Sequence, residues 1–325
     1  MKKEKYLSEF MDSFIGDMES GKRLKFRSSC RVSDGYITNI RSAWVRLKEF
    51  EKQQGCSYRL DEVDMSFRRD FVGFLVRKGL KPNTIKTRMA AIHVAMREAY
   101  ISGLTRNEGF SDPDFIPLAE SVDSVYLTNE QITSLKNLDL TKWSGKIRGI
   151  KLYPQMLRVL EWTRDLFLVG CMTGQRFSDY SRINSSMVTL ICGYKFIKLK
   201  QKKTGAEVII PVDRTFEKIL EKYKGQMPHV ALATFNRNMR ILGEMMGWTH
   251  TPDGGNRFCD MLSSHTARRS FATNAYQRGV PIKSIMAITG HRSERSLRLY
   301  LRLDTRDKAL MAARDFNGFL EIAAR

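Results

Sequence analysis

Two histidines, an arginine and a tyrosine lie between residues 263 and 301 at spacings that a phosphoryl-transfer site would need. An arginine can bind phosphate oxygens, a histidine can move protons, and a tyrosine hydroxyl can act as a nucleophile. His265 and Arg268 stand three residues apart, so a helix beginning here would place both side chains on one face. His291 and Tyr300 complete the group.

The local sequence predicts how the last two of these residues are held. Gly290 can end a helix in the left-handed conformation directly before His291, and Ser293 can cap a new helix that contains Tyr300. Each feature also has an ordinary explanation, because glycine commonly ends helices and a tyrosine between two leucines is commonly a half-buried helix residue. These four residues alone therefore do not establish a phosphoryl-transfer site, and further motifs in the chain are needed to support it.

The charge of the chain favours a nucleic-acid partner. Its 325 residues carry 55 Lys and Arg against 35 Asp and Glu, a net charge of +20. The excess is spread over the chain, with +8 on residues 1–110 and +12 on residues 111–325, which suits a protein that surrounds a polyanion. The length is sufficient for two domains.

Cysteine usage and hydropathy predict a soluble protein of the cytoplasm. The 5 cysteines are scattered and form no CxxC pair, which favours reduced thiols over a disulfide framework or a structural zinc site. The N-terminus lacks an apolar signal core, and no apolar run reaches the length of about 18 residues that a membrane helix needs. We therefore expect no metal, no cofactor and no membrane contact.

Residues 1–106 predict a domain of four helices, because apolar residues recur there at three- and four-residue steps. The stripes run from Leu7 to Met18, from Ile37 to Phe50, from Phe67 to Leu75 and from Ile85 to Met96. Basic side chains beside these helices could meet the phosphates of a nucleic acid, although a solvated charged face is an equally ordinary explanation. These candidate DNA-binding residues are Lys22, Arg23, Lys25, Arg27, Lys81, Lys86 and Arg88.

Residues 107–125 predict a linker, because the composition changes to two prolines and several acidic residues without a helical period. The second domain, residues 126–325, begins with a capped helix and continues with a strongly apolar helix from Met156 to Cys171. The insert at 143–153 has no readable pattern. Three β-rich runs follow at 187–192, 194–200 and 207–212, before helices near 214–223 and 231–246.

Five motifs occur in this second domain in one order, and together they resemble the tyrosine recombinase (phage integrase) family. The N-terminal part resembles its SAM-like helical core-binding domain, particularly as found in Bacteroides-type integrases and invertases. Gln175, Arg269 and Thr289 depart from residues common in the family. The motifs are Thr173-Gly174-x-Arg176-x-Ser178-Asp179, Lys203-Thr204 in a hairpin turn, His265-x-x-Arg268, Gly290-His291 and Tyr300.

The resemblance implies a site-specific DNA recombinase that cleaves and rejoins strands through a 3′-phosphotyrosyl intermediate on Tyr300. Arg176 and Arg268 would bind the nonbridging phosphate oxygens, where negative charge grows during attack. His265 would accept the proton of the tyrosine, and His291 would donate a hydrogen bond to the phosphate. The phosphotyrosyl bond conserves the phosphodiester, so neither ATP nor a metal is required.

Two further roles rest on the resemblance. Lys203 would protonate the leaving 5′-oxygen, and Asp179 would brace Arg176 or His265. An ion pair between Arg176 and Asp179 with no catalytic role stays an alternative. Other lysines of the same hairpin compete with Lys203 by position: Lys198, Lys200 and Lys202.

We expect a mainly α protein with a small antiparallel β-sheet, arranged as a C-shaped DNA clamp. Its expected partners are double-stranded DNA with short inverted-repeat core sites and three further copies, in a tetramer that exchanges the tail 303–325 in trans. Its expected location is the nucleoid of a bacterial cytoplasm. The first stripe begins at Leu7, which leaves no room for an additional DNA-binding domain before it and favours a DNA invertase over the integrase of a mobile element. A type IB topoisomerase-like enzyme and a DNA-binding regulator with an idle site are the alternatives.

Overall fold

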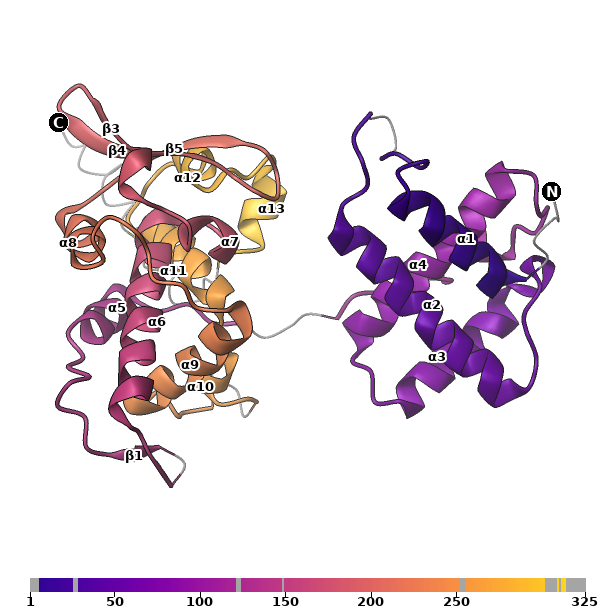
Figure 1. Cartoon of the computed structure of the whole chain (residues 1–325), viewed down its shortest axis with the longest axis horizontal. Coiled ribbons are helices and arrows are strands. Elements are labelled where there is room, and N and C mark those ends of the chain that lie inside the picture. Colours follow the sequence, from indigo (N-terminus) through magenta and orange to yellow (C-terminus); the bar gives the residue numbers. More distant parts are fainter. Residues whose placement is uncertain are drawn as a thin grey trace. The chain divides into compact units, whose positions relative to one another are not determined.

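The structure of the chain, a computed structural model, shows two compact units (Figure 1). They are the N-terminal unit, Met1–Val122, and the C-terminal unit, Asp123–Arg325. Among the described residues, no helix is both long and apolar enough to cross a membrane. The structure describes residues 6–25, 29–120, 124–147, 149–251, 255–301, 309 and 311–313.

Four α-helices and two short 3-10 helices form the N-terminal unit. Each α-helix turns the apolar stripe seen in its sequence toward one common core, because burying these side chains removes apolar surface from water. The six apolar residues of the first stripe, for example, are all buried. The helices are α1 (Leu7–Glu19), α2 (Asp34–Gln54), η1 (Leu60–Glu62), α3 (Met65–Arg77), α4 (Pro82–Ile101) and η2 (Gly109–Ser111).

Aromatic side chains form the centre of the N-terminal core. Phe50 of α2 lies against three rings of α3, those of Phe67, Phe71 and Phe74, with centroids 6.1, 5.2 and 5.3 Å away. Burial of each phenylalanine contributes about 1.5–3 kcal/mol relative to exposure. Asp64 caps α3, because its carboxylate accepts hydrogen bonds from two backbone amides of the first turn.

The first part of the predicted linker 107–125 belongs instead to the N-terminal unit. Phe110 and Phe115 are buried in its core, at 3% and 0% exposed. Asn107 Nδ2 donates to two backbone carbonyls around η1, at 2.9 and 3.1 Å. Pro113 and the acidic residues between 108 and 120 are exposed, while the two phenylalanines anchor the segment. The division between the units falls after residue 122.

The C-terminal unit combines helices with a three-stranded antiparallel sheet, so the predicted fold class, mainly α with a small antiparallel sheet, is confirmed. Its helices are α5 (Asn129–Lys136), α6 (Pro154–Thr173), α7 (Phe177–Tyr180), η3 (Ser185–Met187), α8 (Arg214–Lys222), α9 (Leu232–Met245), α10 (Phe258–Met261), α11 (Ser264–Gln277), α12 (Ile282–Thr289) and α13 (Glu294–Arg298).

The sheet has the strand order β3-β4-β5, with β3 (Val188–Ile191), β4 (Tyr194–Lys200) and β5 (Glu207–Pro211). Side chains of β4 alternate as a half-buried strand requires, so Ile197 and Leu199 are buried while Lys198 and Lys200 are exposed. The turn between β4 and β5 occupies residues 201–206.

A two-stranded hairpin, β1 (Lys146–Ile147) and β2 (Ile150–Lys151), lies in the insert that had no readable pattern. Strands of two residues are too short to show the alternation that identifies a strand in a sequence.

Helices α6 and α11 pack side by side through small residues (Figure 1). A Cβ atom placed on Gly170 of α6 would lie 2.8 Å from the Cβ atom of Ala267 of α11, and equally close to the ring of Tyr180. Only glycine permits this approach. The close packing brings the end of α6 against the beginning of α11, and the proposed phosphate-binding residues lie there.

The helix predicted to contain Tyr300 ends before it. Ser293 caps α13 as the sequence suggested, but the helix stops at Arg298. Tyr300 lies in the following turn, where its backbone N–H donates to the carbonyl of Leu297 at 2.7 Å. Leu297 is the one buried residue of this short helix. The predicted tail, 303–325, lies outside the described residues apart from 309 and 311–313.

Candidate active site

A glycine turn at the end of α6 presents the first arginine. Gly174 ends α6 in the left-handed conformation, with φ 64°, and a Cβ atom there would lie 2.4 Å from the ring of Phe271. Any other residue would therefore be strained and would collide with α11. Arg176 follows as the N-cap of α7, half-buried.

Arg268 joins this turn to α11. Its side chain is 0% exposed, and its Nη1 donates to the carbonyl of Gly174 at 2.8 Å. Ser263 and Thr266 form a capping box at the start of α11, which fixes the turn that carries both His265 and Arg268. The two residues nevertheless differ in surroundings, because His265 is exposed while Arg268 is buried.

The structure brings Arg268, His291 and Tyr300 together from three segments. Arg268 Nη2 lies 3.0 Å from His291 Nε2, and its guanidinium carbon lies 5.4 Å from the centroid of the Tyr300 ring. The rings of His291 and Tyr300 are 5.0 Å apart. Tyr300 is half-buried against α11, α12 and α13. The buried guanidinium is thus the centre of this cluster.

The cluster concentrates positive charge. Burial lowers the pKa of Arg268 to about 10, and repulsion by Arg176 adds to the effect. The guanidinium stays protonated at neutral pH. The pKa of His291 falls to about 4 because of burial and then because of Arg268 and Arg176. A phosphate bound here would reduce the repulsion between the two arginines. Its negative charge would also favour protonation of the neutral histidine.

The tautomer of His291 follows from its neighbours. The hydroxyl of Thr289 donates to the carbonyl of Ile285 at 2.6 Å, so it can only accept from His291 Nδ1, 2.8 Å away. The Nδ1 atom therefore carries the proton. The lone pair of Nε2 then accepts from Arg268, in agreement with the low pKa of this imidazole.

His265 lies within the electrostatic reach of the same cations. Although the residue is exposed, neighbouring protein atoms displace part of the water around its ring, and this is the largest cause of its lowered pKa. Arg269, Arg268, Arg176 and Lys203 follow in that order. Its neutral form is therefore favoured, as a proton acceptor requires. Lys203 of the hairpin turn makes the smallest of these charged contributions.

Lys203 lies at the tip of the turn between β4 and β5, with its side chain exposed. The competing Lys198 and Lys200 lie on the solvent face of β4. Lys202 is held by its backbone, because its N–H donates to Asp179 Oδ1 at 2.8 Å. Lys203 is thus the lysine of this hairpin whose charge acts on His265.

Asp179 has contacts that differ from those expected. It is 0% exposed, and its Oδ1 accepts from the amide of Lys202 at 2.8 Å and lies 3.4 Å from Nη2 of Arg182. The expected partners were Arg176 and His265. A carboxylate on α7 therefore anchors the lysine turn.

The basic residues expected to bind DNA differ in how exposed they are. Lys22, Lys25 and Lys81 are exposed. Arg23 is engaged within the N-terminal unit, because it forms an ion pair with Glu98 and its guanidinium lies 4.6 Å from the ring of Phe14. Lys86 and Arg88 are half-buried on α4. Arg27 lies outside the described residues.

Sequence reasoning missed a second arginine beside Arg88. The pKa of Arg88 is lowered by burial and then by Arg46 of α2. Arg46 itself forms an ion pair with Glu49 at 2.6 Å, so Arg88 is the better candidate of the two for a phosphate contact. The sequence around Arg46 did not predict that it lies near Arg88, because this proximity depends on the packing of α2 against α4.

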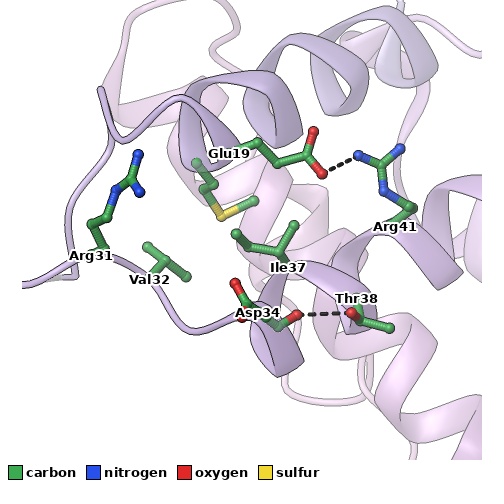
Figure 2. A pocket seen from close by; sticks show the side chains of 8 residues that line it. Glu19, Arg31, Val32, Asp34, Ile37, Thr38 and Arg41 are labelled. Carbon is green, nitrogen blue, oxygen red and sulfur yellow. Dashed lines mark hydrogen bonds and ion pairs between the residues drawn. The ribbon is translucent and has the colours of Figure 1, made fainter.

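A pocket of about 340 Å³ lies on the N-terminal unit between the end of α1 and the start of α2 (Figure 2). Figure 2 shows Arg31 and Arg41 on opposite sides of it, with Glu19 in an ion pair with Arg41. Asp34 supplies a second carboxylate. Because the arginines are balanced by carboxylates, the pocket does not have the charge of a phosphate site. Across the described parts of both units, no cluster of three or more His, Cys, Asp or Glu could hold a metal.

Sequence comparisons relate both units of this chain to known proteins. The profile of the Phage integrase family matches residues 154–306, and that of the Phage integrase SAM-like domain matches residues 6–115. The tyrosine recombinase XerA of Pyrococcus furiosus is 20% identical over 254 residues, which cover 72% of this chain and 88% of the relative. The tyrosine recombinase XerC of Syntrophus aciditrophicus is 22% identical over 329 residues, covering 94% and 97%.

Solved structures show the same fold. A crystal structure of a lambda integrase dimer bound to a COC′ core site has a TM-score of 0.67 at 16% identity, covering 92% of this chain and 96% of that one. A structure of the Tn1549 transposon integrase in complex with transposon right end DNA also has a TM-score of 0.67, at 14% identity, and covers 96% and 99%.

Proposed function

This chain belongs to the phage integrase family of tyrosine recombinases, enzymes that cleave and rejoin DNA, and we propose that it is a site-specific recombinase with Tyr300 as its nucleophile. The observation that carries this proposal is the meeting of Tyr300 with Arg268 and His291, beside a second arginine. A tyrosine held against a buried guanidinium can attack a phosphate that the same guanidinium binds.

Phosphate binding is the proposed role of Arg176 and Arg268. Attack on a phosphodiester increases the negative charge of the nonbridging oxygens, and planar guanidinium groups can donate two hydrogen bonds each to such oxygens. Repulsion between the two arginines is relieved when the anion arrives, so the site favours the charged transition state. The arginines take the place that metal ions occupy in other phosphoryl-transfer enzymes.

The strand-cleavage step moves one proton in and one proton out. His265 accepts the hydroxyl proton of Tyr300 while the phenolic oxygen forms a bond to phosphorus. The bond from phosphorus to the 5′-oxygen breaks, and Lys203 gives that oxygen its proton. A 3′-phosphotyrosyl bond and a free 5′-hydroxyl remain. Attack by a 5′-hydroxyl from a partner strand reverses the step, so no ATP is consumed.

DNA binding changes the proposed state of His291. Without DNA its Nε2 lone pair accepts from Arg268, so it cannot donate there. A phosphate at the site would raise the pKa of His291 from about 4, because a negative charge stabilises the imidazolium. We propose that the histidine becomes a donor to the phosphate only in the complex.

Duplex DNA is the proposed partner of both units. Exposed cations of the N-terminal unit and the half-buried Arg88 support phosphate contacts on that unit. We leave Arg23 out of this set because Glu98 and Phe14 engage it. Arg46 is left out for the same reason, because it forms an ion pair with Glu49. The proposed DNA-binding residues are Lys22, Lys25, Lys81, Lys86 and Arg88, with Arg27 proposed from the sequence alone.

Recombination needs two sites and four strand exchanges, so we propose a tetramer on two inverted-repeat core sites. A lambda integrase tetramer bound to a Holliday junction has the same fold, with a TM-score of 0.64 at 16% identity. We further propose that the tail 303–325 packs on a neighbouring copy. Truncation after Arg302 should leave binding to a single site intact and abolish synapsis. A truncated protein that still recombines two sites would contradict tail exchange.

Covalent trapping tests the nucleophile. A nicked half-site loses its short leaving strand after cleavage, so wild-type protein should accumulate a covalent adduct, also in EDTA. Tyr300→Phe should form none. Tyr276→Phe is the matched control, because Tyr276 packs in the same apolar cluster and should leave trapping intact. An adduct with Tyr300→Phe would move the nucleophile elsewhere.

Assays of adduct formation, plasmid relaxation and site exchange on the same preparation distinguish the alternative functions. A DNA-binding regulator with an idle site would bind without forming an adduct, and a topoisomerase-like enzyme would relax a plasmid without exchanging sites. We expect exchange. A plasmid with two inverted sites reports inversion, one with two directly repeated sites reports excision, and two plasmids with one site each report integration.

A further inference from the structure

Two buried glutamines join the segments that carry the proposed site. Gln175 lies in the turn between α6 and α7, and Gln201 follows the last residue of β4. They are 0% and 1% exposed, and Gln201 Nε2 donates to Gln175 Oε1 at 2.6 Å. Side-chain amides this deeply buried require partners for all their polar atoms, because water cannot replace a missing one.

Each amide has an orientation that its partners fix. Gln175 Nε2 donates to the backbone carbonyls of Thr173 and Ile288, at 3.0 and 2.7 Å. Gln201 Nε2 donates its second proton to the carbonyl of Thr289 at 2.8 Å. Carbonyl oxygens only accept, so both side-chain nitrogens must face them.

The oxygen of Gln201 contacts two parts of the site. Gln201 Oε1 accepts from Arg176 Nη1 at 3.2 Å and from the hydroxyl of Thr204 at 2.7 Å. A guanidinium only donates, which agrees with the same amide orientation. Thr204 is the neighbour of Lys203, so a single side chain contacts both the proposed phosphate-binding arginine and the turn of the proposed acid.

Thr289 continues the connection to His291. Its carbonyl accepts from Gln201, while its hydroxyl accepts from the Nδ1–H of His291. Gly290 lies between them with φ 69°, and a Cβ atom on it would lie 2.6 Å from Gln201 Oε1. Arg292 adds a second link, because its Nη2 donates to the carbonyl of Thr204 at 3.1 Å. The lysine turn and the segment of His291 are therefore held against each other at two points.

We propose that Gln175 and Gln201 are positioning residues that set the relative places of Arg176, Lys203 and His291. This inference rests on the proposed function of those three residues. Every side-chain N–H of the two glutamines is used, so removing either amide leaves buried partners of the other unpaired. The pair therefore acts as one unit. Its loss displaces groups of the site relative to each other without removing any of them.

The experiment compares Gln175→Leu, Gln201→Met and the double variant with wild type. Affinity for an intact half-site should stay within about twofold, because neither glutamine is proposed to touch DNA. The single-turnover rate of adduct formation at saturating protein should fall about 10- to 100-fold, since a displacement near 1 Å costs about 10²-fold in rate. The double variant should be no slower than the slower single variant, because the two residues form one unit.

A change of leaving group distinguishes positioning from general destabilisation. In a half-site with sulfur in place of the scissile 5′-oxygen, the leaving thiolate needs little protonation, because a thiol has a pKa near 8.5. Gln201→Met disturbs the turn of the proposed acid, so sulfur should accelerate its cleavage more than it accelerates wild type. Asn238→Leu is the matched control. Asn238 is a buried amide of α9 bonded to the Thr163 hydroxyl, and its variant should lose stability but show the wild-type sulfur effect.

Three outcomes would overturn the inference: wild-type cleavage rates in both single variants, rate losses that multiply in the double variant, or an equal sulfur effect in Gln201→Met and Asn238→Leu. If Gln201→Met fails to fold, the rate and affinity of Gln175→Leu alone test the inference. A wild-type cleavage rate in Gln175→Leu would then overturn the proposed role of the glutamine pair. Failure of wild-type protein to form an adduct would contradict the proposed function instead.

Discussion

Arg176 and Arg268 carry the same charge in different surroundings. Arg268 is fully buried and donates to the carbonyl of Gly174, so it contributes to the joint between α6 and α11. Arg176 is half-buried and contacts Gln201 at the longer distance of 3.2 Å. The first arginine is thus part of the fold as well as of the site, while the second belongs mainly to the site.

Alanine variants should separate these two contributions. Arg176→Ala and Arg268→Ala should each slow adduct formation by about 10²- to 10³-fold, the usual cost of losing one donor to transition-state charge. Arg268→Ala should also lower the free energy of unfolding more than Arg176→Ala does, because it opens a cavity and leaves a buried carbonyl unpaired, although removal of the buried charge offsets part of this loss. Chemical denaturation and trapping on the same preparations measure both. An equal loss of stability in the two variants would contradict the distinction.

The proposed base depends on its cationic neighbours. A lowered pKa keeps His265 neutral at pH values below its ordinary pKa of 6.5, and a base is active only while it is neutral. When DNA is subsaturating, the fall of the cleavage rate at low pH (the acid limb) reports the pKa of this group in the free enzyme. The midpoint of that fall should therefore lie below pH 6.5. Removing a nearby positive charge raises the pKa and moves the limb to higher pH.

Arg269→Gln should produce this shift, because Arg269 is the largest charged contributor to the low pKa of His265. At neutral pH the rate should change little, and the loss should grow as the pH falls. Arg278→Gln is the control, since it removes a cation from the exposed opposite end of α11. A pH–rate profile for each variant decides the matter. Identical acid limbs in the two variants would remove His265 from the role of base.

Residue types identified the reacting groups, but not the residues that hold them. Arg, His and Tyr at motif spacing carry their chemistry in their identity. Gln201 has no such signal, because its role arises only when the end of β4 meets α12 in space. The same is true of Arg46, whose effect on Arg88 requires two helices to be adjacent. A contact between distant segments cannot be seen in local spacing.

At the scale of elements, apolar periodicity predicted the long helices because each buries one face. Short elements depend on neighbours instead. α13 ends before Tyr300 although its cap was identified, and β1 and β2 were not predicted at all. The predicted linker began too early because two buried phenylalanines outweigh a polar composition.

The glycine that ends α12 permits a test at this scale. Gly290→Ala should be destabilised by about 1–2 kcal/mol, because its φ of 69° is left-handed, and should also lose cleavage because the new Cβ atom would meet Gln201 at 2.6 Å. Gly247→Ala is the matched control. Gly247 has φ 71° but no atom within 4 Å of an added Cβ atom, so its variant should lose only stability. Equal cleavage rates in the two variants would show that the contact with Gln201 is unimportant.

At the scale of the whole molecule, the chain forms two separate cores. The apolar cluster of the N-terminal unit and the two clusters of the C-terminal unit share no residue. Local sequence patterns predicted both sets of helices, since each core forms within its own unit. How the two units would act together on DNA is not visible in such patterns, because it depends on the proposed DNA ligand as well as on the chain.

All proposed catalytic residues lie in the C-terminal unit, and this gives the last prediction. A fragment of residues 123–325 should fold alone, because its core is independent of the other unit. Its half-site affinity should fall about 10²- to 10⁴-fold, because it loses the effective concentration that the connection provides. At saturating concentration its rate of adduct formation should stay within about tenfold of the intact chain, since the reacting groups are unchanged.

The fragment of residues 1–122 serves as the control for this prediction. It should bind the same half-site weakly and form no adduct, and adding it in trans should not restore the affinity of the intact chain. Binding isotherms and single-turnover trapping over a range of protein concentrations separate affinity from rate. A saturated C-terminal fragment that remains more than about 10²-fold slow would mean that the N-terminal unit shapes the reacting phosphate. Its basic helices would then belong to the catalytic site and not only to DNA binding.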